Sequence, residues 1–350
     1  MKIAIDCRLI GSSGIGTFIE NVVAHITEEA RHTYLLIGHP DRLAAYRARS
    51  NCRVVACTLP GFSLNELLRF PTAEVNRCDA FYTPNFNIPM GIRIPVYSTI
   101  HDIVFLDTDH FSNPAKKLLV QWFLRRALRV SRTVFTVSHF SRNRILTVFP
   151  TATPLVVVPN GISRELQQYA EAHPTDGPRE GIVFLGNLKK HKGIRTLIEA
   201  YDLLQQTGTA PTLTIIGRFN FRTKDEQLVE MVETHRDRIR FVTDADNDEV
   251  FRLMSHAEVL ISPSLYEGFG IPPLEAMYLG TPAIISDIPV YKEVYEHLPV
   301  TFFKAGSTKD LYEKMQNHHP TTINIRKEID HLYNYQTAAD RILNTIYGHA

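Results

Sequence analysis

Short apolar runs alternate along the chain with longer stretches in which apolar and polar residues recur at helical spacing. The apolar runs are nearly continuous, which is typical of parallel strands buried on both faces. In the first half of the chain they predict strands at Lys2–Asp6, Tyr34–Gly38, Arg53–Cys57, Ala80–Thr83, Val96–Ile100, Thr133–Ser138 and Leu155–Pro159. Helices are predicted between them at Ile15–Glu29, Leu64–Asn76, Pro114–Ser131 and Phe140–Phe149. This alternation predicts an α/β fold with a doubly wound parallel sheet.

A polar stretch from Tyr169 to Glu180 interrupts the alternation. It contains Pro174, Gly177 and Pro178 and is the predicted linker. The alternation then restarts, with strands predicted at Ile182–Leu185, Thr212–Ile216, Ile239–Val242, Val259–Ser262, Ala283–Ser286 and Val300–Phe303. Further helices are predicted at Gly193–Gln206, Lys224–Arg236, Asp248–Ser255 and Pro273–Leu279. We therefore expect two domains, at residues 1–170 and 178–330. The terminal helix, at about 331–350, packs either on the second domain or back on the first.

Composition and charge narrow the class of protein. The chain of 350 residues is 44% hydrophobic and 21% charged, as in globular proteins, and its net charge is +1. That balance argues against a nucleic-acid-binding protein. The N-terminus does not resemble a signal peptide, and no apolar run approaches the roughly 20 residues of a membrane span. Four cysteines without a C-x-x-C pair argue against structural zinc and disulfides. We expect a cytoplasmic protein.

Ligands of open α/β sheets bind beyond the carboxyl ends of the strands, so polar residues that follow the predicted strands are candidates for a site. The segment Gly11–Gly16 follows the first strand and opens a helix, where backbone amides can approach an anion. Its spacing is not that of the dinucleotide fingerprint, and a tight turn is an equally good interpretation. His101-Asp102 follows the strand Val96–Ile100. Among fifteen histidines, a structural role for any one of them is the alternative.

The most informative segment runs from Ser264 to Met277, with the sequence SLYEGFGIPPLEAM, and follows the predicted strand Val259–Ser262. Consecutive prolines preset a first helical turn, and Gly268 and Gly270 leave amides free to bind an anion at the helix start. Glu267 and Glu275 flank that site, and carboxylates bind sugar hydroxyls rather than phosphate. An anion between two polyol groups describes a nucleotide sugar, with Glu275 at the ribose and Glu267 at the transferred sugar.

A basic segment, Gly186–Gly193, follows the strand Ile182–Leu185 in the same domain. Its three lysines and one histidine could neutralise a diphosphate leaving group as its charge develops. A solvated basic loop is the alternative interpretation. The position at a strand end, as for the glutamate segment, favours the functional one.

These residues together resemble a family. The Glu267-x7-Glu275 string resembles the retaining glycosyltransferases of family 4, the group 1 transferases with the GT-B fold of two Rossmann-like domains facing across a cleft. Gly14-Ile15-Gly16 is similar to their N-terminal glycine loop, and His101-Asp102 to their His-Asp pair. Further similar segments are Ser138–Arg142, Val158–Gly161, Leu279–Pro282 and Tyr335–Ala338. The similar segments together cover nearly the whole chain, and the glutamate string is the most specific of them.

The resemblance implies a role for each matching residue. His101 would contact the donor sugar at the reaction centre, and Glu267 would hold its hydroxyls. Glu275 would bind the ribose. The diphosphate would be bound by Lys192 and by amides around Gly268, Phe269 and Gly270, with the glycine loop at Gly14 and Gly16 also on the donor.

One position departs from the family pattern, and two further features carry alternatives. Asn187 stands where the family usually has an arginine, so Lys189 or Lys190 would have to replace a phosphate donor. The basic helix at 114–131 could contact an anionic membrane, although a solvated sheet-covering helix is the commoner case. Asp244-Ala245-Asp246 imitates the D-x-D motif of metal-dependent glycosyltransferases, but capping of the next helix is the expected role.

We therefore expect a retaining, metal-independent hexosyltransferase that needs no cofactor. Its donor would be a GDP-, dTDP- or UDP-sugar and its acceptor a saccharide or lipid-linked saccharide in bacterial cell-surface polysaccharide or glycolipid synthesis. A mannosyl- or rhamnosyltransferase is preferred because Asp6–Leu9 with Gly14–Gly16 resembles that subgroup. The enzyme would be cytoplasmic, or peripheral at the inner face of the membrane. Two alternatives stay open, a nicotinamide-dependent oxidoreductase and a non-catalytic nucleotide-sugar-binding protein.

Overall fold

The computed structural model describes residues 1–61, 63–108, 114–174, 177–208, 210–217, 226–235 and 237–348. They form two compact units. The N-terminal unit comprises residues 1–163 together with 333–350, and the C-terminal unit comprises residues 164–332. The chain thus passes from one unit to the other between Ser163 and Arg164, ahead of the polar stretch expected to be the linker. The start of that stretch belongs instead to helix α7, Arg164–Ala172.

The N-terminal unit contains a seven-stranded parallel sheet with the order β3-β2-β1-β4-β5-β6-β7. Its strands are β1 (Lys2–Asp6), β2 (Thr33–Gly38), β3 (Cys52–Ala56), β4 (Ala80–Thr83), β5 (Val96–Thr99), β6 (Ser131–Thr136) and β7 (Leu155–Val157). The strand order reverses between β1 and β4. Loops leaving neighbouring strands diverge at such a point, which is where ligands of doubly wound folds bind.

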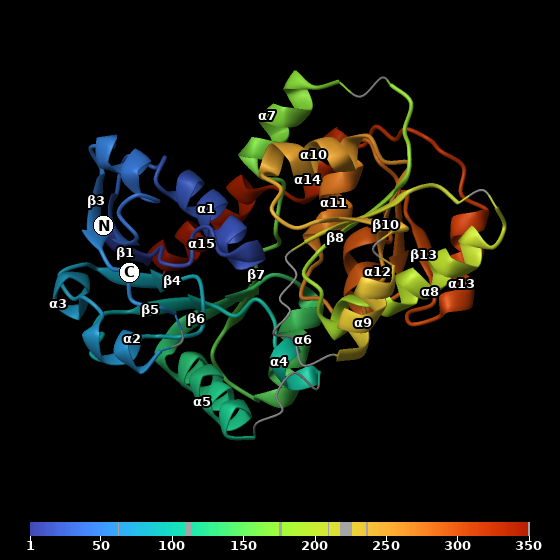
Figure 1. Ribbon diagram of the computed structural model, residues 1–350. Helices are drawn as coiled ribbons and strands as arrows, with labels where there is room; N and C mark the ends of the chain where they lie inside the picture. The colour runs from blue at the N-terminus through green and yellow to red at the C-terminus, as the bar shows by residue number, and fades with distance from the viewer. Residues whose placement is uncertain are drawn as a thin grey trace. The chain divides into compact units, whose positions relative to one another are not determined.

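The helices of this unit cover the sheet and bury its apolar strands (Figure 1). They are α1 (Ser13–Ile26), α2 (Leu64–Arg69), α3 (Thr72–Val75), α4 (Val104–Asp107), α5 (Pro114–Val130), α6 (His139–Val148) and α15 (Tyr335–Tyr347), with a 3₁₀ turn at Ala44–Ala48. Helix α15 comes from the far end of the chain and lies against α1, where the rings of Phe18 and Tyr335 are 6.1 Å apart.

The single helix predicted at Leu64–Asn76 is wrong. The chain forms α2, leaves the helix at Phe70 and restarts in α3. Proline disfavours helical backbone in the residue before it, and Phe70, which precedes Pro71, is extended with φ −60° and ψ 146°.

The C-terminal unit contains a six-stranded parallel sheet with the order β10-β9-β8-β11-β12-β13. Its strands are β8 (Ile182–Leu185), β9 (Leu213–Ile216), β10 (Ile239–Val242), β11 (Val259–Ser262), β12 (Ala283–Ser286) and β13 (Thr301–Phe303). Besides α7, its helices are α8 (Ile194–Gln205), α9 (Glu226–Thr234), α10 (Asn247–Ser255), α11 (Ile271–Tyr278), α12 (Pro289–Tyr295), α13 (Thr308–Gln316) and α14 (Arg326–Leu332). The order reverses between β8 and β11. The predicted α/β architecture of two doubly wound sheets is confirmed.

The helical pattern at the end of the chain is divided between α14 and α15, which belong to different units. Asn334 separates them, forms an isolated parallel bridge with Ile162, and accepts a hydrogen bond from the Thr337 amide that caps α15. Gly161 lies so close that a Cβ there would be 2.6 Å from the Asn334 Cα. Close backbone contact therefore ends one helix and starts the next. The outer residues of the helix predicted at Lys224–Arg236, namely 224, 225 and 236, lie outside the described residues.

Candidate active site

The loops that follow β8 and β11 pack against each other at the carboxyl end of the C-terminal sheet. The Leu265 amide donates a hydrogen bond to the His191 carbonyl at 2.7 Å. Gly193 has φ +66°, and a Cβ at this position would lie 1.8 Å from the Pro263 carbonyl oxygen. Only glycine fits both the backbone conformation and this close approach. The contact fixes the two loops relative to each other.

Lys192 and Glu267 form an ion pair across these loops. Lys192 Nζ lies 2.7 Å from Glu267 Oε1 and 2.9 Å from Oε2. The two side chains are 22% and 12% exposed, so the pair is mostly shielded but reachable from solvent. The sequence predicted both as site residues, for different parts of a donor, but did not predict that they touch. Lys192 sits in a short 3₁₀ turn, Lys190–Lys192, directly before Gly193.

Two polar side chains lie beside the Glu267 carboxylate, Ser264 from the same loop and Tyr291 from helix α12. Ser264 Oγ donates a hydrogen bond to Glu267 Oε1 at 2.7 Å. Tyr291 of α12 lies beneath the loop, with its hydroxyl 2.6 Å from Ser262 Oγ. Burial raises the pKa of Tyr291, and the negative charge of Glu267 raises it further, so the hydroxyl stays protonated. Tyr291 was not predicted as a site residue, because nothing in the sequence indicates that a tyrosine in a later helix contacts Glu267.

The segment Gly268–Gly270 leads into helix α11. Gly270 has φ +87°, and a Cβ there would lie 2.2 Å from the Tyr291 ring. The Tyr295 hydroxyl donates to the Gly270 carbonyl. The Phe269 ring is 3% exposed and belongs to the core. Phe269 can therefore serve a ligand only through its backbone amide. Pro272 and Pro273 occupy the first turn of α11, as expected for a preset helix start.

Glu275 lies on α11 without a compensating charge. No side-chain hydrogen bond or ion pair joins its carboxylate to any residue that the structure describes. Burial raises its pKa from the ordinary 4.5 to about 7. Glu275 is only partly exposed, and a carboxylate that no charged side chain offsets is suited to accept hydrogen bonds from a ligand's hydroxyl groups.

Glu275→Gln should raise the free energy of unfolding at pH 8 by about 1–2 kcal/mol and change it little at pH 4. The pKa is raised on folding, so the stability linked to this carboxyl is complete below pH 4.5 and is lost as the pH rises through about 7. Glutamine cannot ionise and avoids the loss. Urea unfolding at both pH values measures it, with the exposed Glu296→Gln as control. An equal effect at both pH values would contradict an uncompensated Glu275.

The other two lysines of this loop, Lys189 and Lys190, are exposed. Asn187 and Lys189 lie at the surface after β8, and the Lys189 amide donates to the Asn187 carbonyl at 2.8 Å. Leu188 between them is 7% exposed and anchors the turn. Lys189 lies on the same loop as Lys192, and its exposed side chain can reach a ligand bound beside Lys192. Nothing in this geometry replaces the bidentate fork of an arginine.

In the N-terminal unit, His101 follows β5. Its Nε2 lies 3.1 Å from the Pro84 carbonyl oxygen, which can only accept, so Nε2 carries the proton. The Phe18 ring meets the imidazole edge-on, with centroids 4.9 Å apart. Burial lowers the pKa of His101 from 6.5 to about 4, and the bond to Pro84 opposes this shift only in part. His101 is therefore neutral at pH 7, with Nδ1 available as a hydrogen-bond acceptor. Asp102 accepts from the Val104 amide at 3.0 Å.

The two predicted glycines of α1 differ in their surroundings. A Cβ at Gly16 would lie 2.7 Å from the Leu9 carbonyl oxygen, so packing of the loop explains this glycine. A Cβ at Gly14 would meet nothing within 4 Å, so protein packing does not explain this one. Gly14 is exposed at the start of the helix, where a ligand could approach its backbone.

The Asp244-Ala245-Asp246 segment, which imitates a D-x-D motif, caps helix α10. Asp246 is the N-cap residue of this helix and accepts from the Glu249 amide at 2.8 Å, as expected. Throughout the described part of the chain, no three His, Cys, Asp or Glu side chains gather as a metal site would need.

Two family models match the chain and together span most of it. The model for a "Glycosyl transferase 4-like domain" matches residues 13–161, and that for "Glycosyl transferases group 1" matches residues 167–317. The chain belongs to the group 1 glycosyltransferases, as its motifs predicted, and the fold is GT-B.

Curated relatives include glycogen synthase of Mycobacterium tuberculosis, 31% identical over 56% of this chain and 47% of the relative. O-antigen chain mannosyltransferase B of Escherichia coli is 28% identical over 61% of this chain and 58% of the relative. The chain spans about half the length of these relatives. Among solved structures, Anabaena HepE in complex with UDP and glucose is 19% identical, with a TM-score of 0.73 over 99% of this chain and 100% of that one.

Proposed function

We propose that this protein is a retaining glycosyltransferase that moves a hexose from a nucleoside diphosphate sugar to a saccharide or lipid-linked acceptor in the synthesis of bacterial cell-surface polysaccharide or glycolipid. The observation that carries the proposal is the Lys192–Glu267 pair beside the start of α11. A cation, the loop Gly268–Gly270 at a helix start and a separate carboxylate are brought together where doubly wound sheets bind ligands. A nucleotide sugar presents the complementary groups.

In this proposal each group of the donor has a partner in the C-terminal unit. Lys192, with Lys189 and the amides of Gly268–Gly270, binds the diphosphate. Glu275, whose carboxylate has no partner among the described side chains, binds the ribose hydroxyls. Glu267 binds hydroxyls of the transferred sugar. When Lys192 turns to the phosphate, the Glu267 carboxylate is released from its ion pair and becomes available to those hydroxyls.

The N-terminal unit provides the acceptor site and two groups for the reaction. Neutral His101 accepts a hydrogen bond from the donor sugar through Nδ1, because Nε2 is engaged by Pro84. Gly14, which packing leaves unexplained, lets the donor approach the α1 backbone. Mannose and rhamnose are the preferred sugars for two reasons. Asp6–Leu9 resembles the mannosyl- and rhamnosyltransferase subgroup, and one of the curated relatives is a mannosyltransferase. GDP and dTDP donors are therefore tested beside UDP.

The transfer proceeds without a divalent metal in this proposal, because the chain supplies cations and amides to offset the diphosphate charge as it develops. A thermal-shift panel of UDP-, GDP- and dTDP-sugars and free nucleotides tests the proposal. One nucleotide series should raise the melting temperature, in EDTA as in its absence, and in Asp246→Asn as in the wild type. Stabilisation by none of the series would contradict the function, and stabilisation that EDTA abolishes would contradict the metal-free mechanism.

Helix α5 presents an amphipathic surface that fits an anionic membrane, and we include peripheral membrane contact in the proposal. Leu118 is 64% exposed and Trp122 is 41% exposed. Exposed cations at Lys116, Lys117 and Arg125 lie on the same helix. Aromatic and aliphatic side chains among cations are typical of interfacial helices. In the described residues, no helix is long and apolar enough to span a bilayer.

The protein should sediment together with vesicles that contain anionic phospholipid and should stay in the supernatant with neutral vesicles. Trp122→Glu should abolish this binding, and about 0.5 M salt should weaken it, because attraction of α5 to the surface is electrostatic and screened. Lys309→Glu, an exposed charge reversal in the C-terminal unit, is the control. Equal binding to both kinds of vesicle, or no effect of Trp122→Glu, would contradict membrane contact through α5.

A further inference from the structure

The N-terminal unit buries a charged network at the ends of β1 and β4 that the proposed function does not use. The Arg8 guanidinium donates to both oxygens of Asp6, through Nε at 2.8 Å and Nη2 at 2.6 Å. It lies over the Phe70 ring, 4.7 Å from its centroid. The side chains of Arg8 and Asp6 are 3% and 1% exposed. Both charges are thus held in the interior, where a fixed geometry is needed to stabilise them.

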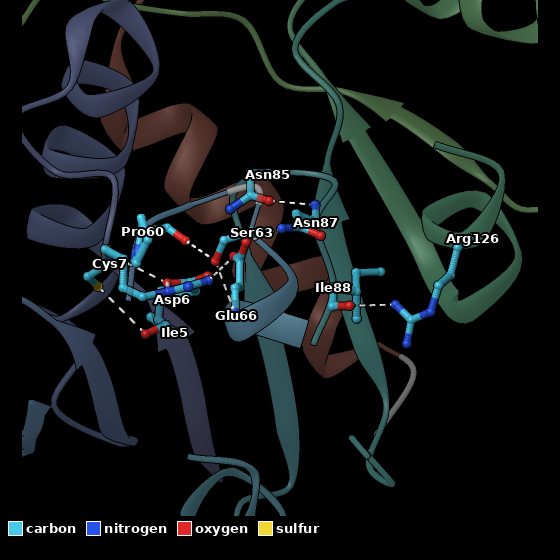
Figure 2. A network of polar contacts seen from close by, with 11 residues as sticks. Ile5, Asp6, Cys7, Pro60, Ser63, Glu66, Asn85, Asn87, Ile88 and Arg126 are labelled. Atoms are coloured by element: carbon cyan, nitrogen blue, oxygen red, sulfur yellow. Dashed lines mark hydrogen bonds and ion pairs between the residues drawn. The ribbon is translucent and has the colours of Figure 1, made fainter. Parts of the chain in front are cut away.

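Glu66 extends this network to the loop that follows β4. One of its oxygens accepts from Arg8 Nη2 and the other accepts from Asn87 Nδ2. The Asn87 backbone N–H donates to Asn85 Oδ1 at 2.5 Å. Figure 2 shows Asp6 and Glu66 meeting at the end of β1, with Asn85 and Asn87 close by on the neighbouring loop. A residue of helix α2 therefore joins β1 to the segment Pro84–Pro89.

The same segment is held from a second side by helix α5. Arg126 donates through Nη1 to the Ile88 carbonyl at 2.5 Å (Figure 2). It also donates through Nη2 to the Pro89 carbonyl at 3.3 Å. The other end of the segment is Pro84, whose carbonyl oxygen accepts a hydrogen bond from His101 Nε2–H. Backbone contacts thus connect Glu66 and Arg126 to the imidazole of His101.

The position of the Pro84 carbonyl decides which ring nitrogen of His101 is free. While that carbonyl accepts from Nε2–H, Nδ1 carries no proton and can accept from a sugar hydroxyl. If the segment shifts, the hydrogen bond is lost, and the neutral ring can move its proton to Nδ1 or turn about its side-chain bonds. Nδ1 would then no longer be a fixed acceptor.

We propose that Arg8, Glu66 and Asn87 are positioning residues, which hold the segment Pro84–Pro89 so that His101 keeps its Nε2 proton and presents Nδ1. The consequence for turnover rests on the role proposed above for His101. The effect on the imidazole does not rest on it. The network carries two carboxylates for one guanidinium, so its hydrogen bonds have a fixed direction, with Arg8 and Asn87 donating and Glu66 accepting.

Glu66→Gln tests this arrangement, because a glutamine that accepts from Arg8 must point its amide N–H at Asn87. Asn87 can turn its own side-chain amide to accept through Oδ1, but its Nδ2 then loses the acceptor that Glu66 provides. We expect turnover to fall about 10-fold to 100-fold, with a Michaelis constant for the donor near that of the wild type. The double variant Glu66→Gln with Asn87→Asp lets glutamine accept from Arg8 and donate to the new carboxylate. It should recover to within about fivefold of wild-type turnover, and the recovery measures the coupling.

Nitrogen-15 NMR of the histidine rings in the full-length protein gives a readout that does not depend on activity. The wild type should show a neutral His101 protonated at Nε2. Glu66→Gln should show loss of this single tautomer, and the double variant should restore it. Arg126→Gln, which leaves the buried charges intact, should also disturb the tautomer. Glu29→Gln, which removes the partner of Arg31 at the surface, should change neither tautomer nor turnover.

If Glu66→Gln and Arg126→Gln lower the melting temperature but leave the Nε2 tautomer in place, the network is merely structural and the inference is overturned. Failure of the double variant to restore the tautomer would also overturn it. Full turnover by His101→Ala would contradict the role proposed for His101 in the reaction. The inferred control of the imidazole by the network would still stand on the NMR result.

Discussion

Glu267→Gln should lower turnover about 100-fold while leaving the binding of free nucleoside diphosphate intact or stronger. The variant keeps the size of the side chain and its hydrogen bond to Ser264 but removes the charge. A carboxylate that binds the sugar while positive charge develops on it acts mostly in the transition state. Removing that carboxylate therefore lowers turnover more than it weakens donor binding.

Binding of free diphosphate provides the second part of this test. Lys192 Nζ is 2.7 Å from Glu267 Oε1, and phosphate must compete with that carboxylate for the ammonium. Without the charge of Glu267, Lys192 is free, and we expect affinity for the diphosphate to rise about threefold to tenfold. Titration calorimetry and steady-state rates measure the two effects. Ser264→Ala, which removes a hydrogen bond but no charge, should lower turnover far less.

A different result would change the role of Glu267. If turnover by Glu267→Gln is normal and only the Michaelis constant for the donor rises, Glu267 is a binding residue and does not act in the transition state. If the diphosphate binds more weakly, the carboxylate helps to position Lys192 rather than competing with the ligand.

Lys192→Met should weaken binding of the sugar donor and of the free nucleoside diphosphate together, by about 10-fold to 100-fold, and leave the nucleoside monophosphate nearly unaffected. The ammonium interacts with the diphosphate, so only ligands that carry the second phosphate lose a partner. Methionine retains the packing of the lysine stem. Lys309→Met, which changes an exposed lysine of helix α13 in the same unit, is the control.

Asn187→Arg extends this test. An arginine at the family's usual position should strengthen diphosphate binding in the wild type and restore part of the loss in Lys192→Met. If all three ligands weaken equally in Lys192→Met, the lysine supports the loop or contacts a group that they share. A weakened monophosphate with an unchanged diphosphate would place the phosphates away from Lys192.

Much of the fold could be predicted, because strands buried on both faces are nearly continuous apolar runs. Strands β1, β4 and β8 begin and end as predicted. Two errors fall where one residue outweighs a periodic pattern. Pro71 divides a helix that periodicity continues, and Asn334 divides the terminal one. Helix α7 was missed because its strongly polar sequence, RELQQYAEA, overlaps a stretch rich in linker residues.

The candidate site could be predicted as a set of residues but not as a set of contacts. Glu267 and Lys192 follow strands that are distant in sequence, and their charges showed only that both suit a nucleotide sugar. Three contacts depend on where the fold places side chains. They are the ion pair between Lys192 and Glu267, the contact of Tyr291 with this loop, and the hydrogen bond between His101 Nε2 and Pro84. Their partners are ordinary residues with no pattern of their own.

The most direct test of the central claim is phosphorus-31 NMR of the wild-type protein with UDP-glucose, GDP-mannose and dTDP-rhamnose, with and without saccharide acceptors. We predict release of the nucleoside diphosphate from donors of one nucleotide series. Proton NMR should show that the transferred sugar keeps the anomeric configuration of the donor. Glu267→Gln should release the diphosphate about 100-fold more slowly. Binding and release from none of these donors, or a product of inverted configuration, would contradict the account.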